Sequence, residues 1–367
     1  MRRITLFYDG AWYTFKWLKY LLYTKDMFRQ YGYDISFLNE EEYEHSHDKV
    51  EILKKDFENN EFDIVFLAFH ASHTGLCSLE KETFEKMMRG LRKNAKSIVW
   101  LDTGDSSGGV WKDAFPYVDK YLKKQICVDR SYYKKRNWGN RPYTDYYYMK
   151  GLIDSENEVI SMPLSDEEIN KIGLSWNWGL GDLFAEKVVS FKNPDYMTSW
   201  KQTLPESVRR YDVHFRGTYD YSFCGFQRNK CFDLLRTMKN IHINDMKTRV
   251  NFELYMNEIS ESKMVISPYG WGEICFRDFE AFINGAMLVK PDMSHIKTFP
   301  EWYVDDYTYR SIRWDFDNFK EVIEDSLNDD NKRIRIAKNA QDLFLLYREN
   351  EGKRRFVEHI IFQINGL

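Results

Sequence analysis

The sequence predicts an α/β protein built from two Rossmann-like domains. Its length of 367 residues exceeds what one hydrophobic core usually serves and suits two domains of roughly 150 to 200 residues each. Short apolar runs alternate with longer amphipathic stretches in both halves of the chain, which is the order of a parallel sheet covered by helices. Two such domains predict a cleft between them.

The first half of the chain begins this alternation at once. Strands are predicted over 4–8, 34–38, 63–69 and 97–101, and helices over 12–30, 49–59 and 78–93. Ligands of parallel sheets collect at the carboxyl ends of the strands. The loops that start at Asp9, His70 and Asp102 are therefore expected on the working edge of this sheet.

A basic and aromatic segment interrupts the pattern over residues 123–150. It contains the run 132–138 and the tyrosines at 143 and 146–148. Two interpretations have equal weight: the segment grips a substrate, or it is an elaborated loop packed on its own domain. Contact with an anionic membrane surface is a third interpretation, with less weight.

The second half repeats the alternation. Strands are predicted over 211–217, 241–243, 264–267 and 286–290, helices over 228–239, 251–260 and 274–284, and a largely helical tail over 318–363. The tail is long enough for a final helix to cross back onto the first domain. We therefore predict an N-terminal domain over 1–200, a C-terminal domain over 201–345 with a linker near 192–207, and a crossing helix over 346–367.

Composition narrows the class of partner. A net charge of -4 and a pI near 6.1 argue against a general nucleic-acid binder, which carries a basic surplus. The five cysteines lack the spacing of a metal site and fit a reducing cytoplasm. No apolar stretch reaches the length of about 18 residues that spans a membrane, so the predicted location is cytoplasmic and any membrane contact is peripheral.

The most informative stretch runs from Ser267 to Ala281. It reads as a strand that passes through Gly270 and Gly272 into a helix, which leaves backbone N–H groups and the positive helix end directed at one place. A diphosphate suits such a place, and Arg277 adds a positive charge. Glu273, Arg277 and Glu280 follow at offsets of four and three, so a helix would place them on one face, where two carboxylates suit the hydroxyls of a ribose or hexose.

This stretch resembles the donor-binding segment of GT-B glycosyltransferases, particularly exostosin-like enzymes and bacterial surface-polysaccharide transferases, where Ser-Pro-x-Gly-x-Gly precedes a helix with Arg and Glu-Ala. The resemblance covers 212–347, and Phe215 to Thr218 with Arg228 looks like the first loop of the family's donor domain. It implies a GT-B fold, with the acceptor bound by the N-terminal domain and a nucleotide-sugar donor by the C-terminal domain.

The resemblance also implies residue roles. Arg216 and Arg277 would hold the diphosphate, Glu280 the ribose, and residues 270–273 the diphosphate and the donor sugar. The donor-binding residues implied are Arg216, Gly217, Tyr269, Gly270, Trp271, Gly272, Glu273, Arg277 and Glu280.

The spacing of the two glutamates departs from the family pattern. Many retaining GT-B enzymes have seven residues between them, whereas Glu273 and Glu280 have six. This leaves the stereochemistry open and favours inversion, in which a base removes the proton of the acceptor hydroxyl. The candidate bases at the sheet edge are Asp9, then Asp105, then His70, although each residue type also serves as a turn or capping residue.

No metal or other cofactor is expected. Asp315 and Asp317 have the DxD form of a divalent-ion site, but Asp317 reads as the N-cap of the helix that follows it. The histidine pairs at 45 and 47 and at 70 and 73 lack a third ligand nearby in the sequence.

The predicted function is that of a metal-independent glycosyltransferase that moves a sugar from a nucleotide-sugar donor to a glycan or glycolipid acceptor in polysaccharide or glycan synthesis. Two alternatives stay open. A sugar-nucleotide epimerase uses the same two-lobed fold without an acceptor, and a non-catalytic carbohydrate- or nucleotide-binding protein would use the aromatic residues, 17% of the chain, as stacking surfaces.

Overall fold

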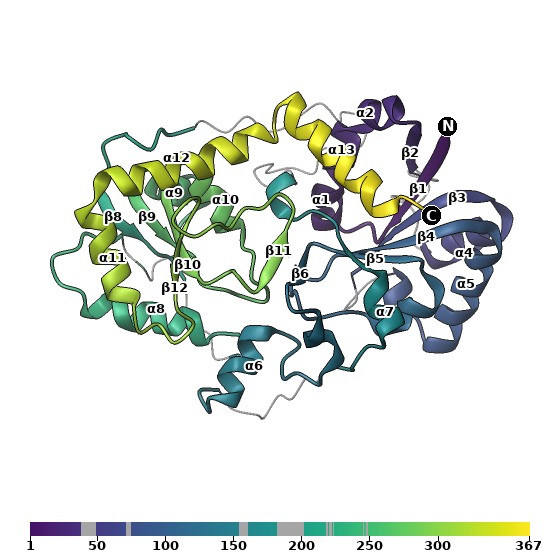
Figure 1. The fold of residues 1–367 in the computed structure, drawn as a ribbon, viewed down its shortest axis with the longest axis horizontal. Coiled ribbons are helices and arrows are strands. Elements are labelled where there is room, and N and C mark those ends of the chain that lie inside the picture. Colours follow the sequence, from purple (N-terminus) through teal and green to yellow (C-terminus); the bar gives the residue numbers. More distant parts are fainter. Residues whose placement is uncertain are drawn as a thin grey trace.

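The structure, a computed structural model, has two α/β lobes, and its C-terminal helices run from one lobe onto the other (Figure 1). It describes residues 1–37, 49–70, 75–153, 161–181, 202–217, 219, 222, 224–244, 246 and 249–367. Two separate parallel sheets, one in each half of the chain, confirm the predicted fold class. Residue 200, the predicted domain boundary, and most of the predicted linker lie outside the described residues.

The N-terminal lobe is built on a six-stranded sheet of order β2-β1-β3-β4-β5-β7, in which every neighbouring pair is parallel. Its strands are β1 (Arg2–Tyr8), β2 (Tyr33–Phe37), β3 (Phe62–Ala68), β4 (Ala95–Asp102), β5 (Lys120–Lys123) and β7 (Ile172–Leu174). Its helices are α1 (Trp12–Tyr23), α2 (Lys25–Gln30), α4 (Lys49–Asn59), α5 (Lys81–Asn94), α6 (Pro142–Met149) and α7 (Asp166–Lys171), with short 3-10 turns η1 (Gly75–Ser78), η2 (Lys112–Tyr117), η3 (Arg130–Lys134) and η4 (Trp178–Leu180).

Alternate residues of the central strand pack into different cores. Ile64 and Phe66 of β3 belong to the core on one face of the sheet, and Val65 and Leu67 belong to the core on the other face. Because both faces are covered, the strand is apolar and buried without alternation from Ile64 to Ala68, as expected for a parallel sheet between two helical layers.

The C-terminal lobe has a four-stranded parallel sheet of order β12-β10-β9-β8. Its strands are β8 (Tyr211–His214), β9 (Ser262–Ile266), β10 (Met287–Pro291) and β12 (Arg310–Ile312), and its helices are α8 (Phe226–Thr237), α9 (Phe252–Ser260), α10 (Phe276–Ile283), α11 (Phe319–Asn328) and α12 (Asp330–Leu346). The strand predicted over 241–243 is wrong. Only an isolated bridge from Ile243 to Val213 forms there, and the Asn244 side chain accepts the hydrogen bond of the Phe215 N–H, at 2.9 Å, where a strand would use its backbone.

The last helix, α13 (Asn350–Ile364), crosses from the C-terminal lobe onto the N-terminal lobe (Figure 1). The Tyr31 hydroxyl donates to Glu358 at 2.8 Å, and the ring of Phe356 packs edge-on against Tyr20 with centroids 4.8 Å apart. The predicted crossing helix is confirmed. With two Rossmann-like sheets and this helix, the chain has the GT-B fold.

A short antiparallel ribbon also joins the lobes. It pairs β6 (Gln125–Cys127) with β11 (Ile296–Thr298), and the Val128 N–H extends it by donating to the His295 carbonyl at 2.9 Å. In the chain, β6 lies between β5 and β7 of the N-terminal sheet, and β11 lies between β10 and β12 of the C-terminal sheet. The ribbon therefore fixes the two sheets relative to each other beside the interlobe cavity described below.

Candidate active site

The loop from Ser267 into α10 is anchored by buried charges. The Ser267 hydroxyl donates to Asp278 at 2.5 Å, and the ammonium group of Lys290, which is fully buried, lies 3.2 Å from the same carboxylate. Asp278 also accepts from the Cys275 N–H at 3.2 Å, which caps the start of α10. The buried ion pair is thus satisfied by hydrogen bonds on both sides, and it holds the loop to its helix.

At Gly272 the C-terminal lobe packs tightly against the N-terminal lobe. A Cβ atom at this position would lie 1.9 Å from the backbone oxygen of Asp105, in the loop after β4. The turn itself is closed by the Gly270 N–H, which donates to the Gly272 carbonyl at 3.1 Å. We expected these glycines to bring the backbone close to a ligand. At Gly272 the close neighbour is instead the N-terminal lobe.

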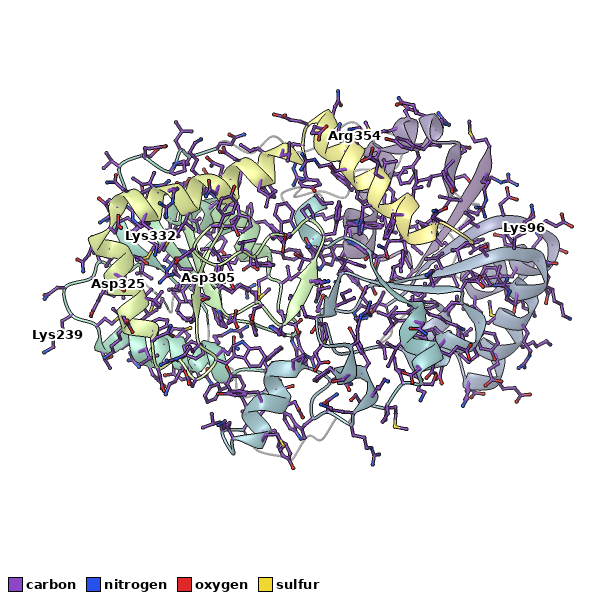
Figure 2. The ribbon with its side chains drawn as sticks, in the orientation of Figure 1. Lys96, Lys239, Asp305, Asp325, Lys332 and Arg354 are labelled. Atoms are coloured by element: carbon purple, nitrogen blue, oxygen red, sulfur yellow. The ribbon has the colours of Figure 1, made fainter. Side chains whose placement is uncertain are left out.

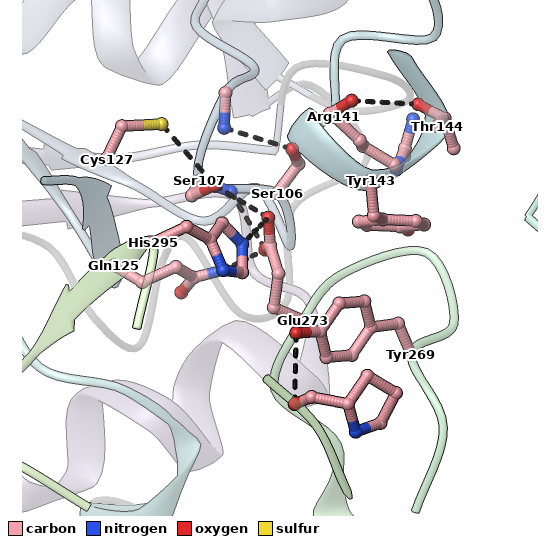
Figure 3. A network of polar contacts seen from close by, with 12 residues as sticks. Ser106, Ser107, Gln125, Cys127, Arg141, Tyr143, Thr144, Tyr269, Glu273 and His295 are labelled. Atoms are coloured by element: carbon pink, nitrogen blue, oxygen red, sulfur yellow. Dashed lines mark hydrogen bonds and ion pairs between the residues drawn. The ribbon is translucent and has the colours of Figure 1, made fainter. Parts of the chain in front are cut away.

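Glu273 links the two lobes rather than facing an open site. Its carboxylate is fully buried and accepts from the Ser107 hydroxyl at 2.6 Å and the Ser107 N–H at 3.0 Å, and His295 lies 3.8 Å away (Figure 3). Burial alone would raise the pKa of Glu273, but the neighbouring His295 and the hydrogen bonds from Ser107 outweigh it and hold the pKa below its usual value.

The predicted helix face of Glu273, Arg277 and Glu280 is wrong, because α10 begins only at Phe276 and Glu273 precedes it. Arg277 and Glu280 do share the helix. The Arg277 guanidinium donates to the Arg216 carbonyl at 2.8 Å, and the Glu280 carboxylate accepts from the Tyr255 hydroxyl at 2.7 Å. Burial raises the pKa of Glu280.

Arg216 is already engaged by a carboxylate. Its guanidinium makes a bidentate contact with Glu258, at 2.5 Å and 2.6 Å, and both side chains are about nine-tenths buried. The Arg216 guanidinium, which was expected to bind a diphosphate, therefore links the loop after β8 to α9. Its carbonyl, rather than its charge, points to Arg277.

Arg228 lies beside both glycine loops of this lobe. A Cβ atom at Gly217 would lie 3.3 Å from the Arg228 Cδ, and one at Gly270 would lie 3.8 Å from its Nη2. Arg228 sits in the first turn of α8, so its cation is brought to the loops after β8 and β9. From the sequence, this residue was indicated only by the resemblance to the family. Its position as a basic residue early in the helix after the first loop could also have indicated it.

A cavity of about 550 Å³ lies between the lobes. Two candidate bases line it, Asp105 and His70, and so do Trp271 and Gly272 of the donor-like loop. The described residues that line it, in full, are Trp12, Tyr13, His70, Thr103, Asp105, Trp178, Trp271, Gly272, Ile274, Cys275 and Phe276.

Asp9, ranked first from the sequence, is not among those described lining residues. Its side chain accepts hydrogen bonds from the Ala11 N–H at 2.9 Å, the Thr14 hydroxyl at 3.1 Å and the His70 N–H at 3.1 Å. Only 3% of the residue is exposed, and burial raises its pKa. The structure therefore places Asp9 as a residue that organises the loops after β1 and β3.

Asp105 is the exposed carboxylate of the cavity. The Lys124 ammonium donates to it at 2.8 Å, and this lysine lies 4.6 Å from the centroid of the Trp178 ring. Desolvation disfavours the charged form of Asp105, but the adjacent Lys124 ammonium outweighs it, so its pKa lies below the usual value of 3.8. Asp105 is consequently a carboxylate at neutral pH.

The basic and aromatic segment reaches across to the C-terminal lobe. The Tyr143 hydroxyl donates to the Gly270 carbonyl, the Arg141 guanidinium donates to the Trp271 carbonyl at 2.6 Å, and the Tyr147 hydroxyl donates to the Trp314 carbonyl at 2.7 Å. Figure 3 shows Arg141 and Tyr143 beside the loop of Tyr269 and Glu273. Of the open interpretations, packing is the one these contacts support, although the partner is the other lobe.

The described part of the chain holds no group of three or more His, Cys, Asp or Glu side chains that could bind a metal ion. Asp315 accepts from the Asp317 N–H at 3.0 Å in a local turn, and Arg313 lies 3.4 Å from Asp315. The N-cap of α11 is Asn318, so the expectation that Asp317 caps this helix is wrong. The histidines at 45, 47 and 73 lie outside the described residues.

Within the part of the chain that the structure describes, no helix has the length and apolar character needed to cross a membrane. Figure 2 shows charged side chains spread over the surface, among them Lys96, Lys239 and Arg354.

No family model matches the sequence, and no curated protein matches it. Among solved structures, the chain is similar to an alpha-glucosyltransferase (AGT) in complex with UDP, at 12% identity over 100% of both chains and a TM-score of 0.49. It is also similar to HepE of Anabaena in complex with UDP, at 8% identity over 100% of both chains and a TM-score of 0.47. A UDP-N-acetylglucosamine 2-epimerase has 10% identity over 99% of this chain and 96% of its own, with a TM-score of 0.44. At such identities a likeness concerns the fold alone.

Proposed function

We propose that this GT-B chain is a glycosyltransferase that moves a sugar from a nucleotide-sugar donor to a glycan or glycolipid acceptor. The observation that carries the proposal is the cavity between the lobes. It brings a carboxylate and an imidazole, Asp105 and His70, to face a glycine loop at the start of α10, the kind of place where a diphosphate binds. A leaving group on one wall and a proton acceptor on the other are what a sugar transfer needs.

The donor belongs to the C-terminal lobe. Arg277 and Arg228 supply positive charge near the loop, and the helix end adds backbone N–H groups. Glu280 already accepts one hydrogen bond from Tyr255, and a carboxylate has further acceptor sites for ribose hydroxyls. Because this charge needs no metal ion to complete it, we propose that transfer is independent of divalent cations. In this proposal Glu273 and Arg216 hold the two sides of the cavity in position, and neither residue binds the donor.

The reaction proceeds by inversion in this proposal. The acceptor hydroxyl oxygen attacks the anomeric carbon, its proton passes to the Asp105 carboxylate, and the bond to the nucleotide diphosphate breaks with its electron pair remaining on the diphosphate. Arg277, Arg228 and the helix end stabilise the charge that develops on the leaving group. His70, which lines the same cavity, is the second candidate for the proton acceptor.

A binding experiment with Arg277→Ala tests the donor site. Calorimetry with UDP, GDP, dTDP and CMP compounds in buffer containing EDTA should find one nucleotide that binds the parent protein. The variant should bind it about 1.5 to 3 kcal/mol more weakly, which is the contribution of a charge-assisted hydrogen bond. Arg89→Ala is the control, because Arg89 is an exposed cation of α5 that pairs with Glu85.

Equal affinity in a folded Arg277→Ala protein would remove the donor site from this position. A strict requirement for manganese or magnesium would contradict metal independence. Product analysis separates the other functions: conversion of the donor without an acceptor is the outcome expected of an epimerase, and binding without turnover is that expected of a non-catalytic protein.

A further inference from the structure

The cavity between the lobes is walled by exposed aromatic rings. Trp12 at the start of α1 is 54% exposed, Trp271 in the loop before α10 is 57% exposed, and Phe276 at the start of α10 is 45% exposed. Large apolar rings are ordinarily covered, and a concentration of exposed ones in a single cavity marks a ligand site. The donor chemistry described above uses none of these three rings.

Basic side chains hold the two indoles in place. The Lys16 ammonium lies 4.9 Å from the centroid of the Trp12 ring, and the Arg141 guanidinium carbon lies 5.4 Å from that of Trp271. Arg141 also donates to the Trp271 backbone carbonyl at 2.6 Å. A ring fixed by its own neighbours loses little conformational entropy when a ligand stacks on it, so both indoles are preorganised.

The polar groups of the cavity limit what can stack there. Asp105 places a carboxylate among the rings, with Thr103 and His70 beside it. Asp105 and Lys124, 2.8 Å apart, form an ion pair with no net charge to attract an ionic ligand, and a hydrocarbon chain would offer the carboxylate no hydrogen bond in exchange for the water it displaces. A sugar ring satisfies both walls, because its C–H face covers an indole while its hydroxyls donate to a carboxylate.

We propose that Trp12 and Trp271, with Phe276, form an acceptor subsite that stacks on an uncharged sugar ring and directs one hydroxyl of that ring to Asp105. The inference rests on the proposed function and narrows it, since it selects a neutral glycan as the acceptor. It also divides the loop before α10 by function. The start of α10 with Arg277 belongs to the donor, and the Trp271 side chain faces the acceptor.

The test is a transfer assay with Trp12→Ala, because Trp12 lies in the N-terminal lobe and away from the donor loop. The acceptors are methyl glycosides of glucose, galactose, mannose and N-acetylglucosamine. Methyl glucuronide serves as the charged analogue of the glucoside. Trp12→Ala should raise the acceptor KM about tenfold, whereas Trp12→Phe should have a KM close to that of the parent. Nucleotide affinity should stay unchanged in both variants. Trp271→Ala should act in the same direction.

Tyr307→Ala is the control, because Tyr307 is an aromatic residue with 56% exposure that lies outside the cavity lining. The inference is overturned if Trp12→Ala leaves the acceptor KM unchanged, or if the glucuronide or a single-stranded DNA is used in preference to every neutral glycoside. It is also overturned if a parent protein that hydrolyses its donor transfers to none of the neutral sugars. If the parent protein neither binds a nucleotide nor hydrolyses a donor, the proposed function itself fails.

Discussion

At the scale of single residues, the site depends on the close packing of Gly272 against the backbone oxygen of Asp105. There is no room for a side chain at Gly272, because a Cβ atom would overlap that oxygen at 1.9 Å. The same loop carries the Asp105 carboxylate into the cavity. Close packing of the two loops therefore sets the distance between the proposed donor site and the proposed proton acceptor.

Gly272→Ala is expected to lower the free energy of unfolding by about 1 to 3 kcal/mol, the usual cost of an overpacked site, as measured by chemical denaturation. Gly90→Ala is the matched control. Gly90 lies within α5, and a Cβ atom there would meet only open space, so alanine should stabilise by about 0.5 to 1 kcal/mol. If the Gly272→Ala protein is as stable as the parent, the contact between the two loops does not contribute to the free energy of unfolding.

Asp105→Asn should reduce turnover by a factor of about 10² to 10⁴ while nucleotide affinity stays nearly constant. The pKa of Asp105 is depressed below 3.8, so its carboxylate persists as the pH falls and is lost only when the pH passes that lowered pKa. The value of kcat/KM should thus stay constant as the pH falls to about 5. An imidazole base would ordinarily make kcat/KM fall below about pH 6.5.

Asp26→Asn, at an exposed position of α2, is the control for this measurement and should keep full turnover. An acidic limb near neutrality, or an active Asp105→Asn protein, would move the proton acceptor to the imidazole of the cavity.

The residues of the site were only partly predictable from the sequence. Asp9, Asp105 and His70 all follow strands of one sheet, so topology alone could not tell that three donors near the end of β1 already occupy the Asp9 carboxylate. Glu273 was misplaced for a different reason. Its partner Ser107 lies 166 residues away in the chain, and no local pattern reveals such a pairing.

At the scale of helices and strands, local patterns were sufficient wherever the apolar pattern of an element was long. Strands β1, β3 and β4 and helices α5, α10 and α13 lie close to their predicted ranges. The predicted helix over 12–30 is broken in two at Thr24, whose hydroxyl donates back to the Tyr20 carbonyl at 2.8 Å. β6 and β11 were missed because three-residue strands with a distant partner leave no periodic signal.

Helix α13 gives a matched pair of phenylalanines for a stability test. Phe356 is fully buried against Tyr20, Phe28 and Trp176, so Phe356→Ala should destabilise the protein by about 3 to 5 kcal/mol. Phe362 on the same helix is 74% exposed, and its change to alanine should stay within about 0.5 kcal/mol. Equal effects in thermal or chemical unfolding would mean that α13 does not dock on the N-terminal lobe as described.

At the scale of the whole molecule, the two lobes share one core. The largest cluster of buried residues includes Ile4 and Leu6 of the first sheet, Phe279 of α10, and Phe356 of α13. The sequence predicted two Rossmann-like lobes and a crossing helix, because each has its own periodicity. It could not predict how closely the lobes meet, since that depends on side chains such as Trp176 and Trp302, which lie far apart in sequence and are both fully buried.

The ribbon of β6 and β11 has a consequence for how this chain could be recombined with others. Within the described residues, β6 and β11 pair as strands with each other and therefore across the lobes, as the pairing of Ile126 with Lys297 shows. A chimera that kept this N-terminal lobe and borrowed a donor lobe from another enzyme would leave β6 as an unpaired edge, which invites pairing between molecules. The lobes of this protein are therefore not interchangeable modules, and a recombined chain has to keep both strands of the ribbon.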